Sequence, residues 1–186
     1  MTVRSVGALM VPKGSKYGSL SEFVSAAKAN PGKLTVAGVG STGGRNFAEL
    51  AKILGIETTY VPVSGGVGKM MPMLQGNHVD AGMTASNHAV KHKATVDTLV
   101  IAGPKSTAAL PGVPSEPQWT YTTTWGIMAP PGTPADRVAK LNDALYQATA
   151  APNVVKIVTD LGLVQMRQTP AEAEAYVNEA IKKFAN

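Results

Sequence analysis

The chain contains no cysteine among its 186 residues. This absence excludes disulfide bonds, a catalytic thiolate and zinc sites built on cysteine. It leaves the cellular compartment open, because an oxidising compartment permits disulfides without requiring them.

Aromatic residues and concentrated charge are also scarce. The formal net charge of +5 favours anionic partners. However, the 17 Lys and Arg residues are scattered, and the densest basic cluster is only Lys91-His92-Lys93. A nucleic-acid binder concentrates its basic residues in a stripe or interleaves them with aromatic rings for stacking. The composition therefore argues against nucleic acid as a partner.

Long hydrophobic runs are missing as well. No stretch approaches the roughly 18 consecutive apolar residues of a membrane-spanning helix, so we expect no membrane insertion. Met1–Arg4 is followed only by a short apolar run at Val6–Val11, which does not match a secretory signal peptide. An export signal for this sequence is therefore expected upstream of Met1 or among residues already removed.

What the chain does contain is a regular alternation of strand and helix patterns. A proline-rich connector is expected at 104–117. Strands are expected at 9–11, 33–37, 58–63, 78–83, 98–102 and 122–129. Helices are expected at 19–28, 45–54, 70–74, 86–92 and from 134 through 145, followed by two more that are separated by 161–168, the last opening at Thr169. This alternation predicts an α/β fold with a largely parallel sheet.

A glycine-rich segment, Gly38–Gly44, lies between an expected strand and an expected helix. Glycines allow a tight turn and bring backbone N–H groups close to a ligand, and a helix N-terminus adds about half a positive charge. Ser41 and Thr42 offer hydroxyl donors, and Arg45 is a candidate full charge. The segment therefore predicts an anion site, most simply a cradle for a carboxylate.

Three other interpretations of this segment remain open. The GxGxxG spacing also suits a dinucleotide site, but such sites want an acidic residue near the end of the next strand. The next strand ends at Val63-Ser64, and Glu57 lies before it. A nucleophile elbow at Ser41 would lack its first glycine. The third of these interpretations is a turn whose glycines serve packing alone.

His88 and His92 are spaced four apart, which suits two zinc ligands on one helix face. No third ligand is apparent nearby in the sequence, so we expect no metal site. Nothing in the chain indicates a bound cofactor or a set of catalytic residues.

Several stretches, taken in order, carry a resemblance to one family over nearly the whole chain. They are KANPGKL at 28–34, the glycine segment with Glu49-Leu50, YVPVSGG at 60–66, LQGNHVD at 74–80, ALPGVPS at 109–115, TWGIMAPPGTP at 124–134 and TPAE at 169–172. With these stretches the chain resembles the periplasmic solute receptors of tripartite tricarboxylate transporters, the Bug-type receptors.

The resemblance implies a type II periplasmic-binding-protein-like fold. It places the ligand-binding lobe at residues 8–120 and the C-terminal part of a companion lobe at 121–186. The family's N-terminal segment, with the signal peptide and the rest of the companion lobe, is expected to be absent from this sequence. The implied function is non-enzymatic: a periplasmic receptor binds a small organic carboxylate and delivers it to the membrane permease subunits of a tripartite transporter.

The resemblance also implies the site residues. The departures from the family are Arg45, where a histidine or another polar residue is usual, and Thr84-Ala85, where Asn or Asp is common. Arg45 would either pair with a carboxylate or point to solvent. The implied ligand-binding residues are Gly40, Ser41, Thr42, Gly43, Gly44, Arg45, Ser64, Gly65, Thr84, Ala85, Ser86 and Asn87. The rival hypotheses are a nucleotide-dependent enzyme and a truncated remnant that binds nothing.

Overall fold

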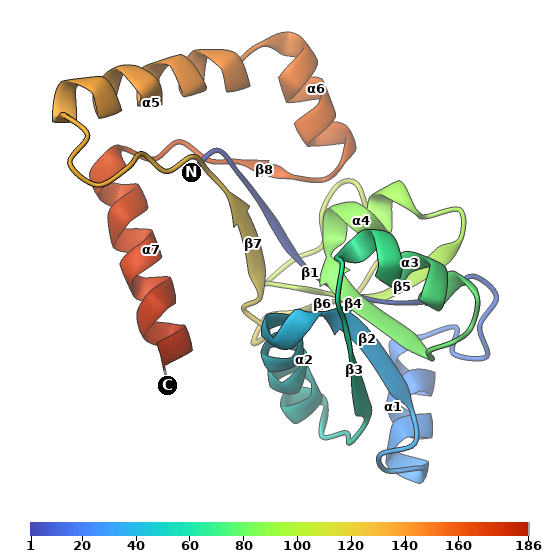
Figure 1. Cartoon of the computed structure of the whole chain (residues 1–186). Helices are drawn as coiled ribbons and strands as arrows, with labels where there is room; N and C mark the ends of the chain where they lie inside the picture. Colours follow the sequence, from blue (N-terminus) through green and yellow to red (C-terminus); the bar gives the residue numbers. More distant parts are fainter. Residues whose placement is uncertain (186) are drawn as a thin grey trace. The chain divides into compact units, whose positions relative to one another are not determined.

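The computed structural model describes the chain from Met1 to Ala185, with side chains up to Lys182. The chain divides into two compact units. The large unit is Ser5–Thr123, and the small unit combines Met1–Arg4 with Thr124–Asn186. These units are defined by contacts within the chain. The division into a ligand-binding lobe at 8–120 and part of a companion lobe at 121–186 is a separate statement about the family's domains, and it stays a prediction. Figure 1 shows the elements of both units.

The large unit is a mixed sheet with helices on both faces (Figure 1). The strand order is β3-β2-β4-β1-β5-β6. Its strands are β1 (Val3–Pro12), β2 (Thr35–Val39), β3 (Thr59–Val63), β4 (Ala81–Ala85), β5 (Val96–Ala102) and β6 (Ser115–Glu116). Its helices are α1 (Leu20–Ala29), α2 (Gly40–Leu54), α3 (Val67–Gln75) and α4 (Ser86–Lys91).

Strand directions confirm the α/β fold with a mainly parallel sheet. β2 runs parallel to β3 and β4, and β5 runs parallel to β6. β1 lies between β4 and β5 and is antiparallel to both. Five of the six strands in this order therefore point the same way, and β1 alone is reversed.

The core of the large unit lies on both faces of the sheet, because successive residues of a strand point to opposite sides. On β1, Leu9 packs with α1 and α2 through Phe23 and Leu50. Its neighbour Met10 packs on the other face with α3 through Met70. All five side chains are fully buried. This two-sided burial explains why the strands have near-continuous apolar runs.

Local capping confirms two of the predicted helix starts. The Ser19 hydroxyl accepts a hydrogen bond from the Glu22 N–H at 3.3 Å before α1. Before α7 (Pro170–Ala185), the Thr169 hydroxyl accepts from the Glu172 N–H at 3.3 Å, while the Thr169 N–H donates to the Glu172 carboxylate at 2.8 Å. This reciprocal pair is a capping box. The Thr169 hydroxyl also donates to the Glu172 carboxylate at 2.9 Å, and the two bonds that this carboxylate accepts from Thr169 lower the pKa of Glu172.

Several predicted boundaries were wrong. β1 begins at Val3 rather than at residue 9, because Val3 and Arg4 pair with the short strand β8 (Val164–Gln165). β4 begins at Ala81 rather than at 78, since Asn77 adopts a left-handed φ of 58° in the preceding turn. The connector at 104–117 contains the short strand β6, which pairs with β5.

The small unit is built from short strands and three helices. β7 (Thr122–Trp125) and β8 (Val164–Gln165) pair with β1 near its start. β7 ends four residues before the predicted end of this strand. The helices are α5 (Ala135–Thr149), α6 (Pro152–Asp160) and α7 (Pro170–Ala185). None of the helices over the described residues is long and apolar enough to cross a membrane.

Candidate functional site

The three predicted ligand segments lie at the carboxyl ends of three adjacent parallel strands of the large unit, and Thr84 and Ala85 are the last two residues of β4. β2 pairs with β3 so that Val39 lies beside Val63, and with β4 so that Gly38 lies beside Met83. The carboxyl ends of these strands therefore meet at one edge of the sheet, at nearly the same level. Ligands of α/β proteins bind outside this edge. The fold brings the starts of the three segments together here.

The glycine segment is not a loop, which corrects the prediction. α2 begins at Gly40, five residues earlier than expected, so Gly40–Gly44 form its first turn. Gly40 has a left-handed φ of 60°, which a glycine adopts without strain. The N-cap residue is Val39, whose side chain has no acceptor for the first N–H groups of the helix. Those groups therefore depend on another acceptor, such as water or an anion.

The glycines of this segment make room for Tyr60 on β3. A Cβ atom would lie 2.6 Å from the Tyr60 hydroxyl oxygen at Gly38 and 2.5 Å from it at Gly43. At Gly44 it would lie 3.0 Å from a Tyr60 ring carbon. The hydroxyl donates to the Gly40 carbonyl oxygen at 2.8 Å. The spacing of these glycines is therefore explained by the packing of Tyr60 against them, and the Tyr60 hydrogen bond fixes the first turn of α2.

The environment of Tyr60 also changes its acidity. Burial raises the pKa of its phenol, and the neighbouring Tyr121 adds to this effect. The neutral phenol that donates to Gly40 is therefore the favoured form over an extended pH range. The Tyr60 ring stacks on Phe47 of α2 with centroids 6.3 Å apart, which fixes its position from the other side.

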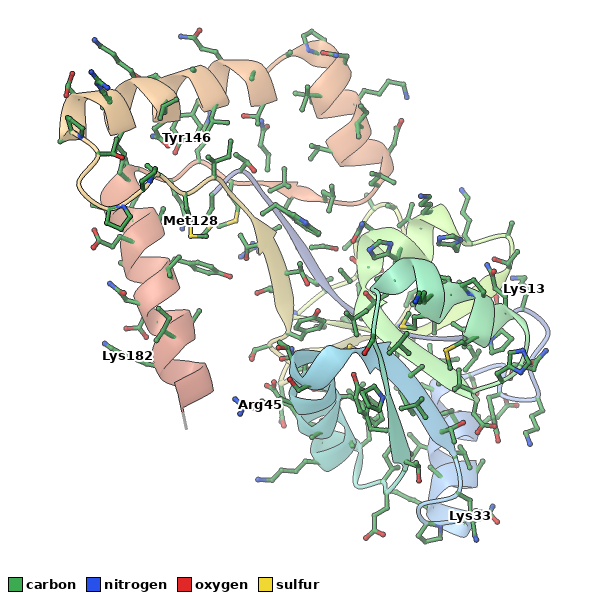
Figure 2. The ribbon with its side chains drawn as sticks, viewed as in Figure 1. Lys13, Lys33, Arg45, Met128, Tyr146 and Lys182 are labelled. Atoms are coloured by element: carbon green, nitrogen blue, oxygen red, sulfur yellow. The ribbon has the colours of Figure 1, made fainter. Side chains whose placement is uncertain are left out.

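The polar side chains at the start of α2 are accessible. Ser41, Thr42 and Arg45 are exposed, whereas Gly43 is buried. Figure 2 shows Arg45 extending outward from the beginning of the helix. Two hydroxyl groups and one guanidinium are thus placed around the first turn, as the predicted anion site requires.

The segment at the end of β4 and the start of α4 is more enclosed than the first. Thr84, Ala85 and Ser86 are buried. The Ser86 hydroxyl lies 3.0 Å from the Ser5 hydroxyl of β1, and the Ser5 oxygen also accepts from the Asn87 N–H at 3.3 Å. The Asn87 side-chain oxygen is buried without a hydrogen-bond partner in the described part of the chain. Ser86 is therefore occupied internally, while Asn87 has unused acceptor capacity.

Ser5 was missed by the sequence reasoning. It orders the start of α4 from a strand that lies 81 residues away in the chain. No signal in the sequence points to it, because the strand was predicted to begin only at residue 9 and serines are common in connecting segments. The remaining predicted residues, Ser64 and Gly65, are exposed beyond β3.

The histidine pair does not gather further ligands. No group of three or more His, Cys, Asp or Glu residues suited to a metal ion occurs within the described residues. His88 is partly buried, and burial lowers its pKa, with further lowering from the charges of His92 and Lys91. This environment favours a neutral imidazole at position 88.

A family model described as the tripartite tricarboxylate transporter family receptor matches residues 1–186. The chain belongs to this family. One relative is the Cupriavidus necator protein named "UPF0065 protein in gbd 5'region", which is 28% identical over 181 residues, or 94% of this chain and 55% of the relative. Another is the "UPF0065 protein in tcbD-tcbE intergenic region" of Pseudomonas sp. (strain P51), 31% identical over 83% of this chain and 49% of the relative.

Several solved structures share the fold of this chain. MatC from Rhodopseudomonas palustris, solved with bound malate, is 28% identical with a TM-score of 0.85 over 97% of this chain and 65% of MatC. Rpa4515 from R. palustris, solved with adipate, is 21% identical with a TM-score of 0.87 over 99% of this chain and 64% of that protein. The periplasmic binding protein BugD is 20% identical with a TM-score of 0.84, over 99% of this chain and 65% of BugD.

The family receptor fold thus extends over nearly all of this chain. The chain spans about half the length of the curated relatives that it matches and about two thirds of the solved receptors. The predicted site residues remain a prediction, because these likenesses concern the family and the fold.

Proposed function

We propose that this chain binds a small organic carboxylate as part of a periplasmic solute receptor. Two observations support the proposal. The chain belongs to the tripartite tricarboxylate transporter receptor family. MatC, which is 28% identical, was solved with malate. Membership of the family carries the proposal, and the geometry of the large unit is compatible with a site for it.

The candidate site is the carboxyl edge of β2, β3 and β4. A carboxylate placed at the first turn of α2 would accept hydrogen bonds from backbone N–H groups that no N-cap side chain satisfies. The helix end contributes about half a positive charge, and Ser41 and Thr42 contribute hydroxyl donors. Arg45 adds a full positive charge near the same turn. Asn87, after β4, would accept from a hydroxyl or another donor on the solute.

The biological role that follows is capture and delivery rather than catalysis. The receptor would release its solute to the membrane permease subunits of a tripartite transporter. No catalytic residues and no cofactor enter this proposal. Its periplasmic setting rests on the family and on the periplasmic receptors that share the fold.

Titration calorimetry with malate and a panel of other dicarboxylates tests the proposal. We expect binding of at least one carboxylate, and the variants Ser41→Ala and Thr42→Ala should each weaken it by about 1 kcal/mol or more. Ser25→Ala is the matched control, because Ser25 is an exposed serine on α1 outside the three segments. Unchanged affinity in the Ser41→Ala/Thr42→Ala double variant would count against the site.

The same titration distinguishes the rival hypotheses. A nucleotide-dependent enzyme predicts binding of NAD or NADP in place of the carboxylates. A remnant without binding activity predicts no heat with any of these compounds. Either result would overturn the proposed function.

A further inference from the structure

The small unit leaves most of its hydrophobic side chains open to solvent. Among the described residues, the buried hydrophobic side chains lie between Ala8 and Trp119, with Val158 on α6 as the one exception. α5 buries none of its residues. The large hydrophobic side chains that are exposed begin at Trp125 and end at Ile181, so over the same residues all of them belong to the small unit. A large exposed apolar patch marks an interaction site.

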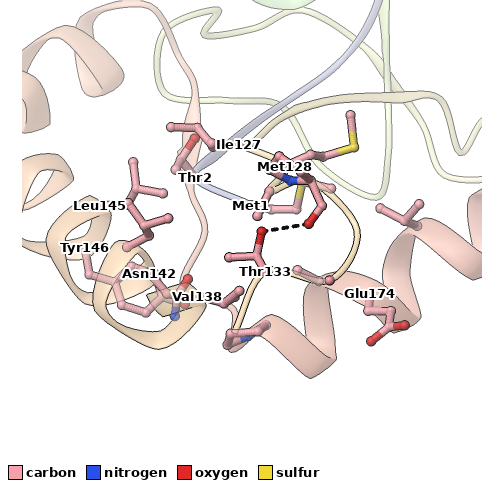
Figure 3. Close-up of a pocket in the computed structure, with 17 residues that line it drawn as sticks. Met1, Thr2, Ile127, Met128, Thr133, Val138, Asn142, Leu145, Tyr146 and Glu174 are labelled. Atoms are coloured by element: carbon pink, nitrogen blue, oxygen red, sulfur yellow. Dashed lines mark hydrogen bonds between the residues drawn. The ribbon is translucent and has the colours of Figure 1, made fainter. Parts of the chain in front are cut away.

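Part of this apolar surface forms a groove within the small unit, shown in Figure 3. Its volume is about 430 Å³, and 17 residues line it. α5 contributes Leu141 and Leu145 to the lining, and α7 contributes Val177. Glu174 is the only charged side chain in the lining. A lining that is apolar and nearly free of charge has the composition found at the centre of protein interfaces.

The same surface also carries apolar side chains that project from it. Ile127 is 69% exposed and Met128 is 86% exposed, although both belong to the lining of the groove. In Figure 3 the end of the Met128 side chain points away from Leu145 and Tyr146 of α5. An apolar projection and an apolar hollow therefore lie side by side. Such a surface can be complementary to a second copy of itself under a two-fold rotation.

We propose that a second copy of this chain covers the groove and forms a closed two-fold dimer. In this dimer, Ile127 and Met128 of each copy enter the groove of the other copy, beside Leu141. The contact is the same in both directions, so it is complete with two copies and leaves no groove open for a third.

The size of the groove supports this occupant. A specific protein interface uses roughly 20–30 residues on each side. The 17 lining residues, together with their neighbours around the groove, come close to this number. The groove is therefore of the right size to form the centre of one interface.

The distribution of charge also favours a second copy over a strongly charged partner. The small unit has seven Lys and Arg residues against six Asp and Glu, whereas the large unit has ten against six. Two copies of the nearly neutral small unit do not repel each other. A strongly acidic or basic partner would find no net charge of opposite sign on this unit to attract it.

This proposal goes beyond the proposed function and does not depend on it. It concerns the small unit, whereas the candidate carboxylate site lies on the large unit. The two are tested by different measurements, so one can fail without the other.

Sedimentation analysis of the full chain tests the proposal. We expect a dimer of twice the 19.2 kDa of one chain, with a dissociation constant of roughly 10 µM or below. Met128→Asp and Leu141→Asp should each weaken self-association by roughly 30-fold or more, because each places a charge in the apolar contact. Ile157→Asp is the matched control, since Ile157 is 56% exposed on α6 and lies outside the groove lining. It should leave the dimer intact.

Cross-linking tests the arrangement of the two copies. The natural chain has no cysteine, so a single cysteine can be placed in each of two proteins that are then mixed. Met128→Cys mixed with Leu141→Cys should form a disulfide-linked pair under mild oxidation, because the proposed contact brings these two positions together. Met128→Cys mixed with Ile157→Cys is the control and should cross-link roughly tenfold more slowly or not at all.

The folding of each variant is checked by circular dichroism and by the emission of Trp119, which is fully buried in the large unit. Met128 and Leu141 are exposed in the single chain, so their substitution should leave both signals unchanged. A monomer at roughly 100 µM, tenfold above the expected dissociation constant, would overturn the proposal. So would oligomers that grow beyond two copies, a dimer that persists in both groove variants, or equal cross-linking in the two mixtures.

Discussion

The packing of Tyr60 against the glycines of α2 predicts that Gly43→Ala destabilises the large unit. A methyl group at residue 43 would lie 2.5 Å from the Tyr60 hydroxyl oxygen. The same oxygen also lies close to Gly38 of β2, where a Cβ would be 2.6 Å away, and the Tyr60 ring is held on its other side by its stacking on Phe47. The ring must therefore shift and lose its hydrogen bond to Gly40.

The expected change in the free energy of unfolding is the sum of two destabilising effects and one stabilising effect. Loss of the hydrogen bond costs about 1 kcal/mol, and overpacking costs about 1–3 kcal/mol. Replacing a glycine within a helix by alanine gains about 1 kcal/mol. We therefore expect Gly43→Ala to lower the free energy of unfolding by about 1–3 kcal/mol, although helix propensity alone predicts the opposite sign.

A double-mutant cycle with Tyr60→Phe isolates the cause. Without the hydroxyl, the nearest atom to a Cβ at residue 43 is the Gly38 carbonyl carbon at 3.4 Å. Gly43→Ala should then be neutral or stabilising by up to about 1 kcal/mol. Gly44→Ala is the matched control, since its Cβ would meet two Tyr60 ring carbons, at 3.0 and 3.2 Å, which phenylalanine retains. Tyr60→Phe should not rescue it.

Urea unfolding followed by tryptophan fluorescence measures these differences. Trp119 is fully buried in the large unit, where its indole N–H donates to the Asn46 carbonyl oxygen at 3.2 Å, so its emission reports unfolding of that unit. Trp125 is 39% exposed, and a Trp125→Phe background removes its signal. Equal destabilisation by Gly43→Ala in the presence of Tyr60 and in the Tyr60→Phe variant would refute the reasoning.

Two further predictions concern the large unit. Ser5→Ala should lower the free energy of unfolding of this unit by about 1–3 kcal/mol, because the buried Ser86 hydroxyl and the Asn87 N–H both lose their partner. Urea unfolding measures this difference, and a change within experimental error would contradict the role of Ser5. The pKa of His88 is lowered in the folded state, mainly by burial, so the unfolded chain binds more protons and stability falls as the pH drops below about 6.5. His88→Gln should reduce this acid sensitivity in urea titrations at a series of pH values, and an unchanged pH dependence would show that another group causes it.

Local patterns in the sequence predict most of the elements correctly. The capping residues Ser19 and Thr169 mark helix starts because their hydroxyl groups bond N–H groups only three residues away. The alternation of apolar strands and amphipathic helices predicts the α/β fold, since each element must bury its apolar face against another layer. The ordered motifs also identify the family, which the match to residues 1–186 confirms.

The start of α2 shows where local patterns fail. Glycines disfavour a helix, so the sequence predicts a loop up to Gly44. The structure extends the helix back to Gly40 because Tyr60, which follows on the next strand, fills the space that missing side chains leave and bonds the Gly40 carbonyl. The same spacing that suggests a ligand-binding loop therefore also serves packing between a helix and a strand.

The sequence by itself determined the types of element, their order and the family, because these depend on spacing along the chain. Only the tertiary structure revealed the reversed central strand, the Ser5–Ser86 pair and the open groove of the small unit. Each of these depends on which residues distant in the chain come into contact, or on contacts that are never made. Patterns among residues close together in the sequence therefore do not predict such contacts.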